Sequence, residues 1–149
     1  ISNVALQQKD AFVADIDHDS DAYDSVFACF KMPKATDEEK VARSAAIQEA
    51  TKYAALVPMQ VARNAYKLMT IIMDVARLGN RNAVTDACVA MMSARSAVLG
   101  ALMNVRINLG SLKDKEFVAQ LHTEADELEH LACAKEKELL DEINQELKV

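Results

Sequence analysis

Five aspartates and one histidine occupy the stretch DIDHDSDAYD, residues 15 to 24. Side chains of these types bind metal ions or transfer protons, and their spacing decides which of these is available. A calcium loop of the EF-hand type requires oxygen ligands at alternate positions, glycine at the sixth position and glutamate at the twelfth. Counted from Asp17, those two positions hold Ala22 and Ala28. The spacing therefore excludes such a calcium loop.

Asp19 is the carboxylate of this stretch that falls among apolar positions. Projected as an α-helix, the segment carries an apolar stripe with Asp19 in its middle. The stripe consists of Phe12, Ile16, Tyr23, Val26 and Phe30. A carboxylate that faces a core must be hydrogen-bonded, paired or protonated, because burying it ionised and alone costs several kcal/mol. Asp19 is therefore predicted either to bind amides or an arginine of another helix, or to act as a general acid or base whose pKa burial shifts toward neutrality.

The other acidic residues of the stretch have different predicted environments. Asp17, Asp21 and Asp24 project away from the apolar stripe and are expected to be solvated. Asp15 lies near the edge of the stripe and His18 on its flank. The charge run is thus predicted to divide into solvent-facing and inward-facing parts.

A second metal hypothesis arises because Asp15 and Glu127 each precede a histidine, His18 and His130, by three residues. Carboxylate bundles that bind two metal ions use this kind of spacing. In the last predicted helix, however, the apolar stripe leaves His130 pointing outward. We therefore expect no metal site, and His122 and His130 are expected to be solvated.

Composition indicates the elements that must position these side chains. The chain has 149 residues, of which half are hydrophobic, with only three glycines and two prolines. This composition favours helix almost throughout and predicts a single all-α domain, a bundle of about five long helices. Pro58 is expected either to kink a helix or to begin a new one. The predicted helices span residues 1–32, 36–57, 58–78 and 81–109, and a last helix of some thirty residues follows a cap at Ser111 and Asp114 and continues to about residue 147.

The charge balance argues against some classes of partner. The formal net charge of −6 provides no basic surface for nucleic acid or for an anionic membrane. No uninterrupted apolar run approaches the ~20 residues that span a bilayer. A cytoplasmic protein without a membrane partner is the expectation.

The helix predicted at 81–109 carries few charges and many small residues, which is typical of a buried central helix. Its polar exceptions fall roughly on one line along the helix. They are Asn82, Asp86, Ser93, Asn104 and Asn108. Such a line suits a binding site, and it equally suits caps, contacts between helices or an oligomer interface.

Several short motifs occur in a characteristic order along the chain. They are Asp19-Ser-Asp-Ala-Tyr23, Met32-Pro33-Lys34, Val57-Pro58, Gly79-Asn80 with Asp86 six residues on, and Asn104-Val-Arg-Ile-Asn108. In their order and spacing, from about residue 15 to the last helix, the sequence resembles the cyclodeaminase domain of formiminotransferase-cyclodeaminase. It also resembles the bacterial single-domain cyclodeaminases and methenyltetrahydrofolate cyclohydrolases related to that domain.

This resemblance implies an all-helical domain that forms a homodimer and binds folate, with or without a polyglutamate tail, in a cleft between helices. The implied reaction closes 5-formiminotetrahydrofolate to 5,10-methenyltetrahydrofolate with loss of ammonia, and no cofactor beyond the tetrahydrofolate substrate is expected. The catalytic aspartate of the family falls on Asp19, and recurrent folate-site positions fall on Asn80, Asp86, Asn104 and Asn108. Hydrolytic opening of the methenyl ring is the alternative reaction. A non-catalytic folate-binding or helical interaction protein is the alternative class.

The resemblance also bears on domain organisation. The family pattern begins with a glycine-rich segment and a first helix, and the residues from Ile1 onward do not supply them. Residues 1–149 are therefore expected to form one cyclodeaminase-like helical domain that is the C-terminal part of a longer chain.

Overall fold

The computed structural model describes residues 2–147, and these residues form four α-helices and one short 3₁₀ helix. The prediction of an all-α fold is confirmed, with four long helices in place of about five. In chain order they are α1 (Ser2–Phe30), α2 (Asp37–Leu78), η1 (Arg81–Ala83), α3 (Val84–Leu109) and α4 (Lys115–Glu146).

The difference in helix number comes from α2, which continues without a break through Pro58 over 42 residues. A proline inside a helix removes one backbone hydrogen bond and crowds the preceding turn. Pro58 lies in a buried stretch between Val57 and Met59, which are 7% and 0% exposed. Burial of these side chains against neighbouring helices offsets the lost hydrogen bond, so the proline does not divide the helix.

The start and end of α2 follow from side-chain and backbone contacts. Thr36 Oγ1 accepts a hydrogen bond from the Glu39 amide at 3.2 Å, and Glu39 accepts one from the Thr36 amide at 3.1 Å, which together form a capping box. Gly79, which follows α2, has an extended backbone with φ of −86° and not the left-handed conformation that commonly ends a helix. Its amide donates to Val75 O at 2.9 Å, and a Cβ on Gly79 would lie 2.3 Å from that oxygen. Glycine is thus required there for close approach of the backbone.

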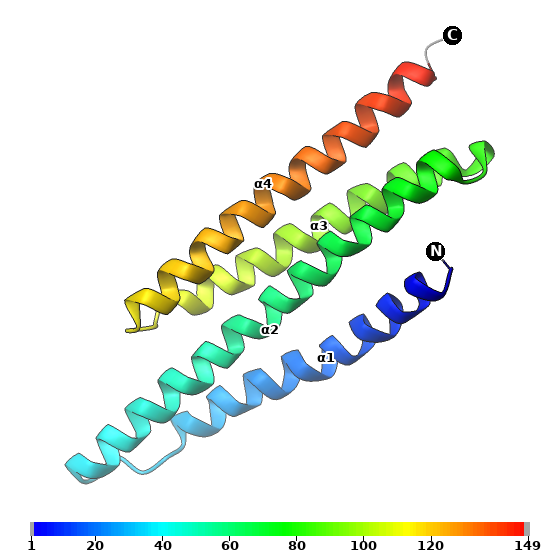
Figure 1. The fold of residues 1–149 in the computed structure, drawn as a ribbon. Helices are drawn as coiled ribbons and strands as arrows, with labels where there is room; N and C mark the ends of the chain where they lie inside the picture. The colour runs from blue at the N-terminus through cyan, green and yellow to red at the C-terminus, as the bar shows by residue number, and fades with distance from the viewer. Residues whose placement is uncertain (1, 148–149) are drawn as a thin grey trace.

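The helices run up and down, with α1 and α4 on opposite sides of the central α2–α3 pair (Figure 1). The side chains of Met59, Met69, Met91, Val98 and Leu102 are fully buried in the core. By length and composition alone, Arg81–Leu109 is apolar enough to cross a membrane, although polar residues interrupt its apolar runs. The central helix of a bundle passes the same test, and α3 packs against both α2 and α4.

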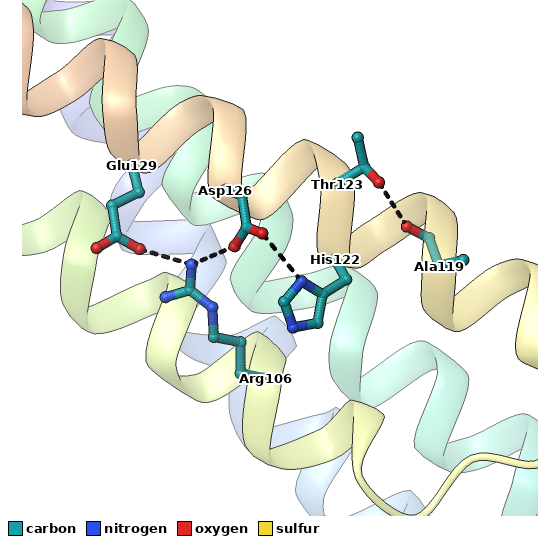
Figure 2. Close-up of polar contacts among 6 residues, drawn as sticks. All are labelled: Arg106, Ala119, His122, Thr123, Asp126 and Glu129. Atoms are coloured by element: carbon teal, nitrogen blue, oxygen red, sulfur yellow. Dashed lines mark hydrogen bonds and ion pairs between the residues drawn. The ribbon is translucent and has the colours of Figure 1, made fainter.

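Ion pairs attach α4 to both central helices. On the α2 side, Arg63 donates two hydrogen bonds to Glu124, at 2.6 and 2.7 Å. On the α3 side, Arg106 donates to Asp126 at 2.9 Å and to Glu129 at 2.6 Å. Figure 2 shows the Arg106 guanidinium between these two carboxylates, with His122 facing the other oxygen of Asp126.

We expect acid to weaken the attachment of α4. The hydrogen bonds from Arg63 hold the pKa of Glu124 below its usual 4.5, and Arg106 likewise lowers the pKa of Asp126. A carboxylate whose pKa is lower in the folded state contributes stability above its unfolded pKa and loses it as pH falls through the folded value. The thermal midpoint followed by circular dichroism should therefore fall as the pH drops below about 4.5. Glu124→Gln carries no titrating group at this position and should show a smaller drop, and an unchanged pH dependence would contradict the assignment.

Candidate functional site

A cavity of about 390 Å³ lies where α1, α2 and α3 meet. Each helix contributes residues spaced three or four apart, so each presents one face to the cavity. The lining residues are Phe12, Asp15, Ile16, Asp19 and Ser20 from α1, Pro58 and Val61 from α2, and Ala97, Gly100, Ala101 and Asn104 from α3. Two carboxylates and no Lys or Arg line this cavity, so its formal charge is negative.

A second, more apolar cavity of about 450 Å³ adjoins the first and shares Phe12 and Ala97 with it. Its remaining lining residues are Ala65, Leu68, Ile72, Ala90, Ser93 and Ala94. The two cavities together form a groove along the α1 and α3 helices, acidic and polar at one end and apolar at the other. A ligand with a polar part and an apolar part suits this groove.

The structure places two of the predicted site residues, Asp19 and Asn104, on the same cavity. Asp19 comes from α1 and Asn104 from α3, 85 positions apart in the sequence. Two residues that the family motifs marked thus line one cavity. The chemical role assigned to Asp19 stays a prediction.

The expected burial of Asp19 is wrong, because its side chain is exposed. Ile16 and Tyr23 of the predicted apolar stripe are each 66% exposed, and Phe30 is 52% exposed. The reason is that α1 packs chiefly on α2, while its flank toward α3 opens into the groove. Asp19 therefore stands at the groove and not in the core.

Asp15 is the residue that sequence reasoning left ambiguous, and the structure turns it inward. Its side chain is 13% exposed, and Oδ2 accepts a hydrogen bond from Asn64 Nδ2 of α2 at 3.2 Å. Asp17, Asp21 and Asp24 are exposed, as predicted. Asp15, one helical turn before Asp19, is thus the partly buried carboxylate of α1.

Asn108 follows Asn104 by one helical turn but does not line the cavity. Its amide donates to Ala54 O of α2 and to Asn104 O, each at 3.0 Å. These bonds join α3 to α2 beside the site. Asn108 therefore makes a contact between helices, which is one of the structural roles that the sequence allowed for the polar line of α3.

Asn80 and Asp86 lie at the far end of α3 from the cavity. Asn80 Oδ1 accepts from the Asn82 amide at 3.0 Å and caps η1, and Asp86 is exposed in the first turn of α3. Asp86 and Asn104 are separated by roughly 27 Å along the helix at 1.5 Å per residue. The structure does not bring Asn80 or Asp86 to the cavity, and their assignment to folate binding stays a prediction.

Small residues of α3 also line the cavity with Asp19, and the sequence had not indicated a site role for them. Ala97, Gly100 and Ala101 precede Asn104 at spacings of seven, four and three residues, and this regularity was the available signal. A Cβ added to Gly100 would meet no atom within 4 Å. The glycine therefore borders open space in the cavity and is not required for helix packing.

The metal hypotheses can be compared with the described residues. The DIDHDSDAYD stretch lies entirely within α1, so it forms no loop. Within residues 2–147, no group of three or more His, Cys, Asp or Glu side chains is arranged to hold a metal ion. His122 and His130 are exposed on α4, as predicted.

The fold and the groove define an α-helical domain with an acidic site between its first three helices. The model of the formiminotransferase-cyclodeaminase family matches residues 1–127, and the chain belongs to this family. It is 40% identical over 102 residues to methenyltetrahydrofolate cyclohydrolase of Methylorubrum extorquens, a match that covers 68% of this chain and 49% of that protein.

Two further relatives support the family and the fold. Formimidoyltransferase-cyclodeaminase of Gallus gallus is 36% identical over 111 residues, covering 74% of this chain and 20% of that protein. The crystal structure of formiminotetrahydrofolate cyclodeaminase from Thermotoga maritima superposes with a TM-score of 0.79 at 24% identity, over 95% of this chain and 68% of that one. The matched segment thus spans about half, or less, of the length of these curated relatives.

Proposed function

We propose that this chain is part of a folate one-carbon enzyme that converts 5-formiminotetrahydrofolate to 5,10-methenyltetrahydrofolate and ammonia. The observation that carries the proposal is the acidic groove, in which Asp19 of α1 and Asn104 of α3 line one cavity. The family of the chain and the names of its relatives supply the substrate class. The pterin ring would lie at the polar end of the groove and the aminobenzoyl group at the apolar end.

In the proposed reaction, N10 attacks the carbon of the protonated formimino group, whose nitrogen becomes an amino group, and the Asp19 carboxylate accepts the proton from N10. The Asp19 carboxyl then donates this proton to the amino group, the carbon–nitrogen bond breaks, and ammonia leaves with the bonding electron pair. The products are the 5,10-methenyl cation and the Asp19 carboxylate, so atoms and charge balance. The carboxylate stabilises the cation, and more strongly where the bound substrate excludes water from the groove.

Hydrolytic opening of the methenyl ring is a second candidate reaction for the same groove. It is favoured by the 40% identity to the Methylorubrum extorquens cyclohydrolase. Water would add to the carbon between N5 and N10, and Asp19 would accept one of its protons. One of the two carbon–nitrogen bonds would then break as the hydroxyl proton moves to that nitrogen, which leaves a formyl group on the other nitrogen, and Asp19 would release its proton to solvent. Both reactions use a carboxylate beside the same carbon, so the groove is compatible with either.

An absorbance assay tests the proposed function and separates the two reactions. The protein is mixed with 5-formiminotetrahydrofolate, and the appearance of methenyltetrahydrofolate absorbance is followed. It is then mixed with methenyltetrahydrofolate, whose absorbance is lost on hydrolysis. Formation supports the cyclodeaminase proposal, loss alone supports the cyclohydrolase, and neither change, with folate still bound, indicates a non-catalytic binding protein. The assay also tests the expectation that no cofactor beyond the folate is needed, because none is added.

Oligomeric state and cellular location belong to the same proposal. We expect the enzyme to act as a homodimer in the cytoplasm, because the family resemblance implies a dimer and the net charge of −6 offers no basic surface for nucleic acid or anionic lipid. Sedimentation equilibrium of the purified protein would measure the dimer directly.

A further inference from the structure

Asp15 differs from the comparably buried interhelical carboxylate Glu136 in having no lysine or arginine partner among residues 2–147. The two side chains are almost equally covered, at 13% exposed for Asp15 and 15% for Glu136. Glu136 accepts a hydrogen bond from Arg95 at 2.9 Å. Asp15 instead accepts from the neutral amide of Asn64, and His18 Nδ1 lies 3.8 Å away, beyond hydrogen-bond distance.

The Asn64 amide is held in a fixed orientation by a second hydrogen bond. Gln60 Nε2, one turn earlier on α2, donates to Asn64 Oδ1 at 3.0 Å. The amide nitrogen of Asn64 therefore points to Asp15, and the chain of bonds runs from Gln60 through Asn64 to the carboxylate. Two side chains of α2 thus orient one carboxylate of α1 on the cavity wall.

A covered carboxylate that receives hydrogen bonds but no positive charge retains its negative field. Asp15 lines the same cavity as Asp19, one helical turn away, and no Lys or Arg side chain lines that cavity. Asp15 also lines a neighbouring pocket with His18 and Arg63, and Arg63 itself is paired with Glu124. The field of Asp15 therefore reaches a group bound in the cavity that it shares with Asp19. A bound group with positive charge would supply the partner that Arg95 supplies to Glu136.

We infer that Asp15 binds the positively charged carbon–nitrogen unit of the folate ligand, and that Asn64 is the residue that positions Asp15. This inference rests on the proposed function and adds a division of labour within the site. Asp19, which is exposed at the groove, exchanges the proton. Asp15, which is covered and oriented, recognises the cation that forms.

A comparison of two folates tests this inference, because 5,10-methenyltetrahydrofolate is cationic at the reacting position and tetrahydrofolate is uncharged there. Asp19→Asn serves as the parent protein, so that turnover of the bound ligand is suppressed, and dissociation constants are measured by rapid mixing. Adding Asp15→Asn should weaken methenyltetrahydrofolate binding roughly tenfold, in the range that a hydrogen bond to a charged group contributes. Binding of tetrahydrofolate should change by less than about twofold, because the asparagine keeps the shape of the side chain.

Two more variants sharpen the comparison. Asn64→Ala should shift the preference in the same direction by a smaller factor, because the carboxylate remains but is no longer oriented. Asp17→Asn removes the same charge from an exposed position on α1 and should leave the preference unchanged. Thermal melting of each variant shows whether the fold is retained.

The outcomes separate this inference from the function on which it rests. A selective loss of methenyltetrahydrofolate binding in the Asp15→Asn protein supports the role of Asp15. Equal loss of both folates would assign Asp15 to structure alone, and no loss of either would remove it from the site; both results overturn the inference. If the parent binds neither folate, the proposed function fails and this inference fails with it.

Discussion

Replacing Asp19 with asparagine is expected to lower turnover of 5-formiminotetrahydrofolate by roughly 10²-fold or more, the lower range of general acid catalysis. The amide has nearly the shape of the carboxyl but cannot donate a carboxylic proton to the departing nitrogen. Folate affinity should stay within a few-fold, because the other lining residues of the groove are unchanged. The loss should therefore appear in kcat and not in KM.

Asp21→Asn is the matched control for this experiment. Asp21 lies on the same helix, is exposed and does not line the cavity, so its replacement removes the same charge without touching the site. Its kcat should remain at the level of the unmodified protein. Near-normal turnover in the Asp19 variant, or an equal loss in both variants, would remove Asp19 from the proposed mechanism.

Local sequence signals predicted the helices well because the physical causes are local. The capping box at Thr36 and Glu39 sets the start of α2 through contacts three residues apart. The Asp114 side chain accepts from the Phe117 amide and begins α4 in the same manner. Local signals could not predict that α2 continues through Pro58, because this continuity depends on the burial of Pro58 by helices distant in the sequence.

The candidate site was predicted in part for a related reason. Family motifs selected Asp19 and Asn104, and the fold brings both to one cavity. The helical projection misjudged the burial of Asp19, because a period of 3.6 residues gives the direction of a side chain but not which flank a neighbouring helix covers. The inward turn of Asp15 likewise required the position of Asn64, 49 residues later in the sequence.

Gly100→Leu is expected to weaken folate binding by roughly 2 kcal/mol, about 30-fold, because the leucine side chain would occupy space that the bound folate fills, and overpacking costs this much. A Cβ at this position meets nothing within 4 Å, so the added side chain enters open space at the groove and leaves the core undisturbed. The thermal midpoint should not fall, because leucine is a better helix former than glycine. Isothermal titration with tetrahydrofolate, together with thermal melting, measures both quantities.

Two variants give this prediction its specificity. Ser96→Leu adds similar bulk to an exposed position of α3 outside both cavities, and it should bind folate normally. Gly100→Ala adds a single carbon and should raise the stability of the helix by up to about 1 kcal/mol with a small effect on binding. Normal binding by Gly100→Leu would place the folate elsewhere on the molecule. A loss of binding shared by Ser96→Leu would mean that bulk anywhere on this face of α3 interferes, in which case the ligand contact extends beyond the cavity at Gly100.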